Sequence, residues 1–182
     1  QATPPSATLL YGAVVPPRGG DTVFADGYRA WEALSPTMQA LLMPLNAVHS
    51  AAPAYGTSGL FARDDASRSM RIRVSPDAER RERHPLARRH PLSGRIALYI
   101  NHVYTLAIDG LAPDESRALL DFLLRHMTRP EFVYRHRWQA RMLLVWDNRC
   151  AVHYADGGYD GHARLMYRST VAGERPQAAR GA

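Results

Sequence analysis

The stretch DNRCAVHYADGGYDGHARLMYR, Asp147 to Arg168, decides the fold of this chain because it joins two extended segments through a glycine-rich turn. These two segments read CAVHYA and ARLMYRSTVAG. Two further extended segments, FVYRHRW and RMLLVWD, precede them in the chain. Runs of this length that are rich in apolar and aromatic residues and separated by turns predict four β-strands. The pattern favours a mainly β fold, a sandwich or jelly roll with a helical cover.

Apolar spacing elsewhere predicts further strands and three helices. Residues 7–15 (ATLLYGAVV) and 94–101 (GRIALYIN) read as strands, and HVYTLAI continues the second in extended form. Apolar residues recur at helical spacing from Asp26 to Leu42, where Ser35-Pro36 resembles a cap followed by a first helical residue. Two short helices are therefore expected there. Residues 112–127 form the strongest helix candidate, with acidic residues at its start and leucines along one face.

The length of 182 residues suits one domain, which we place at residues 1–176. Residues from about 47 to 91 lose periodicity and predict a long excursion or lid, while residues 177–182 predict a flexible tail. The chain opens on Gln1, and strand-like sequence follows almost at once. We therefore expect it to be a fragment of a longer chain, truncated at its N-terminus.

The charge pattern argues against a nucleic-acid partner. The net charge is +6 and all 23 basic side chains are arginine, but ten of them, with five acidic residues, lie between Arg63 and Arg95. No aromatic residues are interleaved with these arginines, so a solvated basic segment or an anion-facing lid is the better interpretation. A single cysteine fits a cytoplasmic location. No apolar run is long enough for a membrane helix, and the start does not resemble a signal peptide.

Three side chains of the opening stretch could carry chemistry. In an extended strand, Arg164 and Arg168 point to the same face, and His153 lies across the glycine turn. If that face is buried, both guanidinium groups need anions such as carboxylates or sulfonates; if it faces outward, they are ordinary surface residues. His153 is either a structural histidine or a metal ligand. A histidine, a hairpin and two inward arginines together indicate a metal centre beside an anion site.

Other kinds of site have weaker support. The sequence has no cysteine and histidine pairs at zinc spacing and no nucleophile-elbow motif. Cys150 precedes His153 by three residues, which places the two side chains on opposite faces of a strand and argues against a cysteine nucleophile.

The opening stretch, extended as WDNRCAVHYADGGYDGHARLMYR, resembles the C-terminal signature of the iron(II)/2-oxoglutarate-dependent taurine dioxygenase (TauD/TfdA) family. PPRGGDTVFADGYRAWEALS resembles the family's middle signature, and HPLSGRIALYIN and LLRHMTRPEFVYRHRW match other family phrases. The resemblance covers nearly the whole chain. It implies a double-stranded β-helix that holds Fe(II) through two histidines and one carboxylate, leaving positions for 2-oxoglutarate and O2.

The resemblance also implies roles for individual residues. His153 would be the distal iron ligand, and Arg164 would pair with the C5 carboxylate of 2-oxoglutarate, helped by the Thr22 hydroxyl. Arg168 would meet the C1 carboxylate, the anionic group of the substrate, or both. Tyr104 would line the substrate site, where the family usually has phenylalanine. The resemblance further implies that two residues support the site without reacting, Trp146 and Asn148.

The family's other two iron ligands lie in an H-x-D motif, which this sequence lacks. None of the eight histidines has a carboxylate two positions later, and the motif's place would fall just before Gln1. We expect a small anionic substrate, with a sulfonate such as taurine first and an aryloxyacetate, alkyl sulfate or other carboxylate next. Without the motif we expect weak iron binding and no turnover, so an inactive remnant that binds 2-oxoglutarate or other anions is the alternative. A homo-oligomer is usual in the family.

Overall fold

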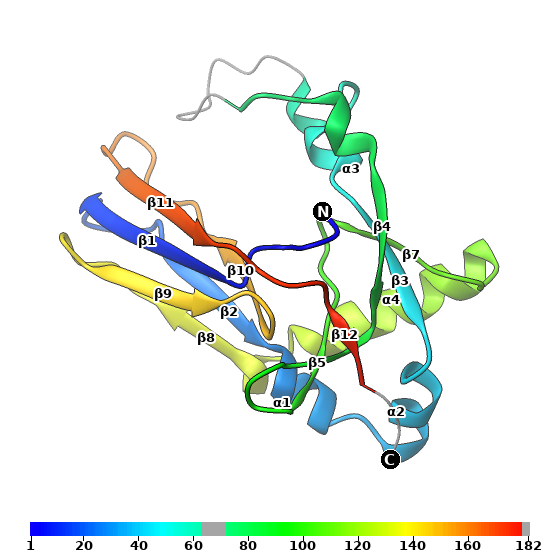
Figure 1. The fold of residues 1–182 in the computed structure, drawn as a ribbon. Helices are drawn as coiled ribbons and strands as arrows, with labels where there is room; N and C mark the ends of the chain where they lie inside the picture. Colours follow the sequence, from blue (N-terminus) through cyan, green and yellow to red (C-terminus); the bar gives the residue numbers. More distant parts are fainter. Residues whose placement is uncertain (63–71, 180–182) are drawn as a thin grey trace.

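Two three-stranded antiparallel sheets that face each other form the half of the molecule that carries Thr22, His153 and Arg168 (Figure 1). The structure is a computed structural model that describes residues 1–62 and 72–179. The first sheet has the order β11 (Leu165–Val171), β1 (Ala7–Val14) and β9 (Leu143–Asp147). The second has the order β10 (Ala151–Ala155), β2 (Thr22–Asp26) and β8 (Val133–His136).

The chain passes repeatedly between these two sheets. From β8 onward each successive strand changes sheet. The strands β8 and β10 belong to the second sheet, and β9 and β11 belong to the first. This is the strand arrangement of a jelly roll, as the sequence predicted. The strands β10 and β11 both lie at sheet edges.

Two smaller sheets and the helices form the other half of the molecule. One sheet has the order β4 (Arg81–Pro85), β3 (Asn46–Ser50) and β7 (Thr105–Ile108), and the other has β12 (Gln177–Ala178), β5 (Ala87–Arg89) and β6 (Ile96–Leu98). The helices are α1 (Gly27–Glu32), α2 (Pro36–Leu42), α3 (Ala52–Tyr55) and α4 (Pro113–Met127), with 3-10 turns at Leu60–Ala62, Pro76–Glu79 and Pro130–Phe132.

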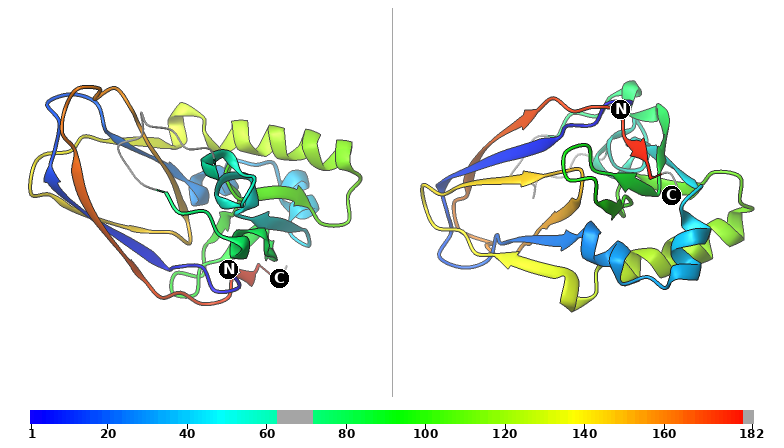
Figure 2. Two further views of the ribbon diagram at one scale, coloured as in Figure 1. Left: turned by 90° about the horizontal axis from the view of Figure 1, so that it is seen from above. Right: turned by 60° about the horizontal axis from the view of Figure 1, so that its bottom comes forward.

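The hydrophobic core lies in this second half. Buried side chains of α1 and α4, such as Trp31 and Leu123, pack with Leu98 of β6 and Ile108 of β7. Figure 2 shows that the strands of the two facing sheets extend away from the end of the molecule where α1, α2 and α4 lie. The site strands are therefore anchored to a packed core at one end. In the described parts of the chain, none of the helices has the length and apolar character that a membrane span requires.

Local signals in the sequence account for the helices. Ser35 caps α2, because its Oγ accepts a hydrogen bond from the Met38 amide at 3.3 Å, and Pro36 occupies the first turn. Glu115 accepts a hydrogen bond from the Ala112 amide at 2.9 Å at the start of α4. Both short helices and the long helix were predicted. The four strands predicted around the opening stretch are confirmed as β8, β9, β10 and β11.

Regular elements occur in two segments that the sequence predicted to be an excursion and a flexible tail. The stretch 47–91 is not a structureless excursion, because it contributes most of β3, all of β4 and β5, and helix α3. Its strands are short and bury polar residues such as His84 and Arg88, which hides the apolar alternation. The tail is also ordered through residue 179, since β12 pairs with β5 and Ala179 is buried. Residues 63–71 and 180–182, which belong to the same two predictions, lie outside the described residues.

Candidate functional site

His153 lies on β10 and faces the first sheet. Its ring centroid is 4.8 Å from that of Trp146 on β9 and 6.2 Å from that of Phe24 on β2. Phe24 is the direct cross-strand partner of His153 and also contacts Trp146 edge-on at 5.3 Å. The imidazole thus contacts one ring from each sheet, and the residue as a whole remains exposed. Alternation along β10 and β2 places both side chains inward.

The surroundings of His153 favour its neutral form. Burial among the rings and, next, the positive charge of Arg168 lower the pKa of His153 below its usual value. An imidazole that is neutral at pH 7 presents a nitrogen lone pair, which is the form that binds metals.

Arg168 points from β11 into the space between the two sheets. It pairs with Leu10 of β1, two residues from Thr8, which pairs with Trp146. Arg168 and Trp146 therefore share one face of the first sheet, and Trp146 packs on His153. This settles which face of the strand is inward, a question that the sequence left open. The Arg168 side chain remains exposed, so it is accessible to a soluble ligand.

Tyr104 lies in the turn before β7 and belongs to the same electrostatic environment. Burial and then the neighbouring Tyr55 raise the pKa of Tyr104 to about 12, while the charge of Arg168 acts in the opposite direction. The Tyr104 ring stacks on Tyr55, with centroids 6.4 Å apart. Arg168 is therefore within electrostatic reach of both His153 and Tyr104.

Arg164 lies just before β11 and is held against the glycine turn that precedes β2. Its Nη2 donates a hydrogen bond to the carbonyl of Gly20 at 3.2 Å, and its guanidinium carbon lies 5.5 Å from the centre of the Tyr159 ring. Gly20 has φ +69°, and a Cβ there would lie 3.0 Å from Arg164 Nε. Glycine is needed at this position for both its backbone conformation and the room that it leaves for the guanidinium.

Thr22 lies two residues beyond this turn and is 2% exposed. Its Oγ1 accepts a hydrogen bond from the indole Nε1 of Trp138 at 3.0 Å. A hydroxyl has one proton to donate in addition to its acceptor lone pairs, so Thr22 keeps a donor for a ligand. Arg164 and Thr22 thus converge on one turn, while His153, Arg168 and Tyr104 form a second group.

Trp146 and Asn148, for which a supporting role was expected, lie at the end of β9. Asn148 Nδ2 donates to Thr8 Oγ1 at 2.9 Å, and its backbone amide donates to the Ser6 carbonyl at 2.8 Å. Both bonds fasten the end of β9 to the start of β1. Trp146 is buried against His153, and its Nε1 has no partner.

Among the described residues, His153 is the one candidate metal ligand that the sequence predicted. Across residues 1–62 and 72–179, the structure contains no cluster of three or more His, Cys, Asp or Glu side chains that could hold a metal ion. His153 fits one position of a metal centre, because its imidazole is neutral and remains accessible. The cysteine alternative gains no support, since burial raises the pKa of the Cys150 thiol and so disfavours the reactive thiolate.

Several residues of the site were not found from the sequence. Phe24 could have been identified by its alternation with Thr22 along β2. Trp138 offered no such signal, because it reaches Thr22 across 116 residues of sequence. Tyr55 lies within the stretch that was predicted to lack structure.

Comparison with known proteins agrees with this fold. The family model described as "Taurine catabolism dioxygenase TauD, TfdA family" matches residues 1–170. A sulfate ester dioxygenase of Pseudomonas putida is 36% identical over 94% of this chain and 56% of its own length. A 2,4-dichlorophenoxyacetate dioxygenase of Cupriavidus pinatubonensis is 40% identical over 88% of this chain and 53% of its own length. Both are named as α-ketoglutarate-dependent.

Solved structures show the same similarity. The crystal structure of a taurine dioxygenase from Burkholderia xenovorans superimposes with a TM-score of 0.81 at 34% identity, covering 97% of this chain and 55% of that one. AAD-2, solved with Mn(II) and N-oxalylglycine, has a TM-score of 0.81 at 33% identity, covering 98% of this chain and 68% of that one.

The fold is the double-stranded β-helix of the solved structures to which the chain is similar. The chain belongs to the TauD, TfdA family. It spans about half the length of the curated relatives that it matches.

Proposed function

We propose that the complete protein is an iron(II)- and 2-oxoglutarate-dependent dioxygenase that uses O2 to hydroxylate a small organic anion, with release of succinate and CO2. The observation that carries the proposal is the placement of His153 and Arg168, which face each other from the two sheets. A neutral metal-binding side chain beside a fixed positive charge suits a metal-bound carboxylate. The naming of the relatives as α-ketoglutarate-dependent supports the same cosubstrate.

Each site residue then has a proposed role. His153 would bind the metal through its lone pair, and the rings of Trp146 and Phe24 would exclude water from that side. Arg164 and Thr22 would hold the C5 carboxylate of 2-oxoglutarate by charge and a hydrogen bond. Arg168 would hold the C1 carboxylate, the anionic group of the substrate, or both. When bound, the metal and 2-oxoglutarate supply the oxidising chemistry, and the protein supplies positioning.

The substrate would lie between Arg168 and Tyr104. We propose a sulfonate such as taurine first, with an aryloxyacetate, an alkyl sulfate or another carboxylate next. Relatives named for sulfate esters, 2,4-dichlorophenoxyacetate and sulfonates support this range of anions. The Tyr104 hydroxyl, where the family usually has no polar group, would affect the choice among them.

The remaining aspects of the proposal concern the setting of the enzyme. We propose a cytoplasmic location, supported by the single free cysteine, Cys150. We expect neither nucleic acid nor a membrane as partner, because the excess of arginine is confined to one segment. A homo-oligomer would follow the usual behaviour of the family.

Anaerobic titration of the complete protein with iron(II) and 2-oxoglutarate tests the proposal. A chelated complex is expected to give a weak visible charge-transfer band that is absent from His153→Ala. His162→Ala, which removes an exposed histidine of the same hairpin, is the matched control and should keep the band. A protein that binds neither iron(II) nor 2-oxoglutarate would contradict the proposal.

A second candidate function is distinguished in the same titration. No band, combined with 2-oxoglutarate binding that is lost in Arg164→Ala, would favour a protein that binds the cosubstrate without turnover. This candidate is supported by one observation, that His153 is the single recognisable metal ligand among the described residues.

Substitution of Gly20 by alanine is expected to weaken 2-oxoglutarate binding by about tenfold, because the added methyl group displaces the Arg164 guanidinium without removing it. Gly110→Ala is the control, since Gly110 also has positive φ, +84°, but a Cβ there meets nothing within 4 Å. Calorimetric titration of both variants measures the difference. Equal losses in the two would show that backbone strain, and not contact with Arg164, is responsible.

A further inference from the structure

The turn from Asp147 to Cys150 connects the two sheets that carry the site. It follows β9 in the first sheet and precedes β10 in the second. Trp146 comes immediately before the turn, and His153 comes three residues after it, with their rings 4.8 Å apart. The amide of Gly27 donates to the Cys150 carbonyl at 2.7 Å, which fastens the far end of the turn. The position of this turn therefore determines how the metal-binding histidine meets the first sheet.

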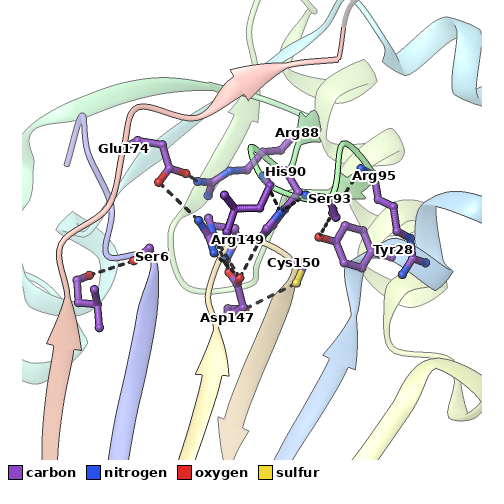
Figure 3. A network of polar contacts seen from close by, with 12 residues as sticks. Ser6, Tyr28, Arg88, His90, Ser93, Arg95, Asp147, Arg149, Cys150 and Glu174 are labelled. Carbon is purple, nitrogen blue, oxygen red and sulfur yellow. Dashed lines mark hydrogen bonds and ion pairs between the residues drawn. The ribbon is translucent and has the colours of Figure 1, made fainter.

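Asp147 is the centre of a cluster of ion pairs around the turn (Figure 3). Its carboxylate accepts hydrogen bonds from Arg149 Nε at 2.9 Å and Nη2 at 2.6 Å, from the Arg149 amide at 2.8 Å, and from His90 Nε2 at 3.0 Å. Burial raises the pKa of Asp147, but the bonds from Arg149 and His90 outweigh it and lower the pKa to about 2. The carboxylate is therefore charged at any physiological pH.

His90 ties Asp147 to the hairpin between β5 and β6. Its Nδ1 accepts hydrogen bonds from the amides of Leu92 at 3.3 Å and Ser93 at 3.2 Å. Since Nδ1 is an acceptor, Nε2 carries the proton and donates it to Asp147. His90 is 7% exposed, so this bond is shielded from water.

Glu174 ties the other side of the cluster to the C-terminal segment. Its Oε1 accepts a hydrogen bond from Arg88 Nη2 at 2.8 Å, and its Oε2 lies 3.7 Å from Arg149 Nη1. Arg88 is only 1% exposed and belongs to β5. The turn is thus held by the His90 imidazole on one side and by the Glu174 carboxylate on the other (Figure 3).

We infer that this cluster is a positioning device, in which Asp147, Arg149 and Glu174 hold the β9–β10 turn so that His153 on one sheet stays in register with Trp146 and Arg168 on the other. The part of the inference that concerns ligand binding rests on the proposed function. The part that concerns the contact between Trp146 and His153 does not.

Nuclear magnetic resonance on the metal-free protein tests the geometry directly. The cross-relaxation between the Trp146 and His153 ring protons is expected to weaken in Asp147→Asn and in Glu174→Gln, measured well below the unfolding temperature. Dissociation constants for 2-oxoglutarate should rise about tenfold in the same variants. Asp109→Asn is the matched control, because it removes an ion pair of similar length, 2.8 Å to Arg83, away from the turn. It should leave both readouts unchanged.

The two readouts separate positioning from stability. Variants that unfold at lower temperature but keep the Trp146–His153 signal and the 2-oxoglutarate affinity would overturn the inference, since the cluster would then only stabilise the fold. Glu174→Gln decides the question if Asp147→Asn does not fold, because it leaves the Asp147–Arg149 pair intact. Absence of 2-oxoglutarate binding in the unsubstituted protein would contradict the proposed function, and the ring signal would still test the positioning role.

Discussion

Replacing Arg164 with alanine is expected to weaken 2-oxoglutarate binding by about 100-fold. The variant loses a charge-assisted hydrogen bond to a carboxylate in a partly buried position, which contributes about 1.5–3 kcal/mol. The affinity of Arg164→Lys for 2-oxoglutarate should lie between those of the unsubstituted protein and Arg164→Ala. Lysine retains the charge, but it has no planar fork and cannot also bond the Gly20 carbonyl in the same way. Calorimetric titration with 2-oxoglutarate measures all three proteins.

Arg18→Ala is the control for this prediction. Arg18 is an exposed arginine that adjoins the same glycine turn, so its loss changes the net charge equally without removing the contact at Gly20. We expect less than a twofold effect, as for a solvent-screened charge. If Arg18→Ala and Arg164→Ala weakened binding alike, the general positive potential of this end would hold the anion, and the specific role of Arg164 would be wrong.

The parts of the fold that the sequence predicted are those with local signals. Helix α2 begins where Ser35 and Pro36 supply a cap and a first turn, and α4 begins where Glu115 reaches back to the Ala112 amide. The four strands from β8 to β11 are rich in apolar and aromatic residues, and turns separate them. In each case, residues within a few positions of one another determine the structure.

The parts that could not be predicted depend on contacts between distant residues. The inward direction of Arg168 follows from its pairing with Leu10 and from the packing of Trp146 on His153, and neither contact is local. The strands of residues 81–89 were missed because His84 and Arg88 are buried there despite being polar. A buried arginine becomes plausible only when its partner is known, and Glu174 lies 86 residues away.

Acidification from pH 7 to pH 4 is expected to remove about 3 kcal/mol of unfolding free energy through His49 alone. Burial and then the charge of His84 lower the pKa of His49 from 6.5 to about 4. The folded state therefore keeps this imidazole neutral, while the unfolded chain binds a proton near pH 6.5. The stabilising contribution is fully present above pH 6.5 and is lost as the pH falls from there through about 4. The pKa of His84 is lowered as well, chiefly by burial, and adds a loss in the same direction.

Urea unfolding at intervals between pH 7 and pH 4 measures this loss, and His49→Phe should reduce the slope of unfolding free energy against pH. His102→Gln, which changes an exposed histidine, should leave the slope unchanged. The carboxylate of Asp147 contributes little to the slope between pH 7 and pH 4. Its pKa in the folded state is about 2, against a usual 3.8, so its contribution is lost at more acid pH than that of His49. A His49→Phe protein with the original slope would show that other groups cause the acid sensitivity.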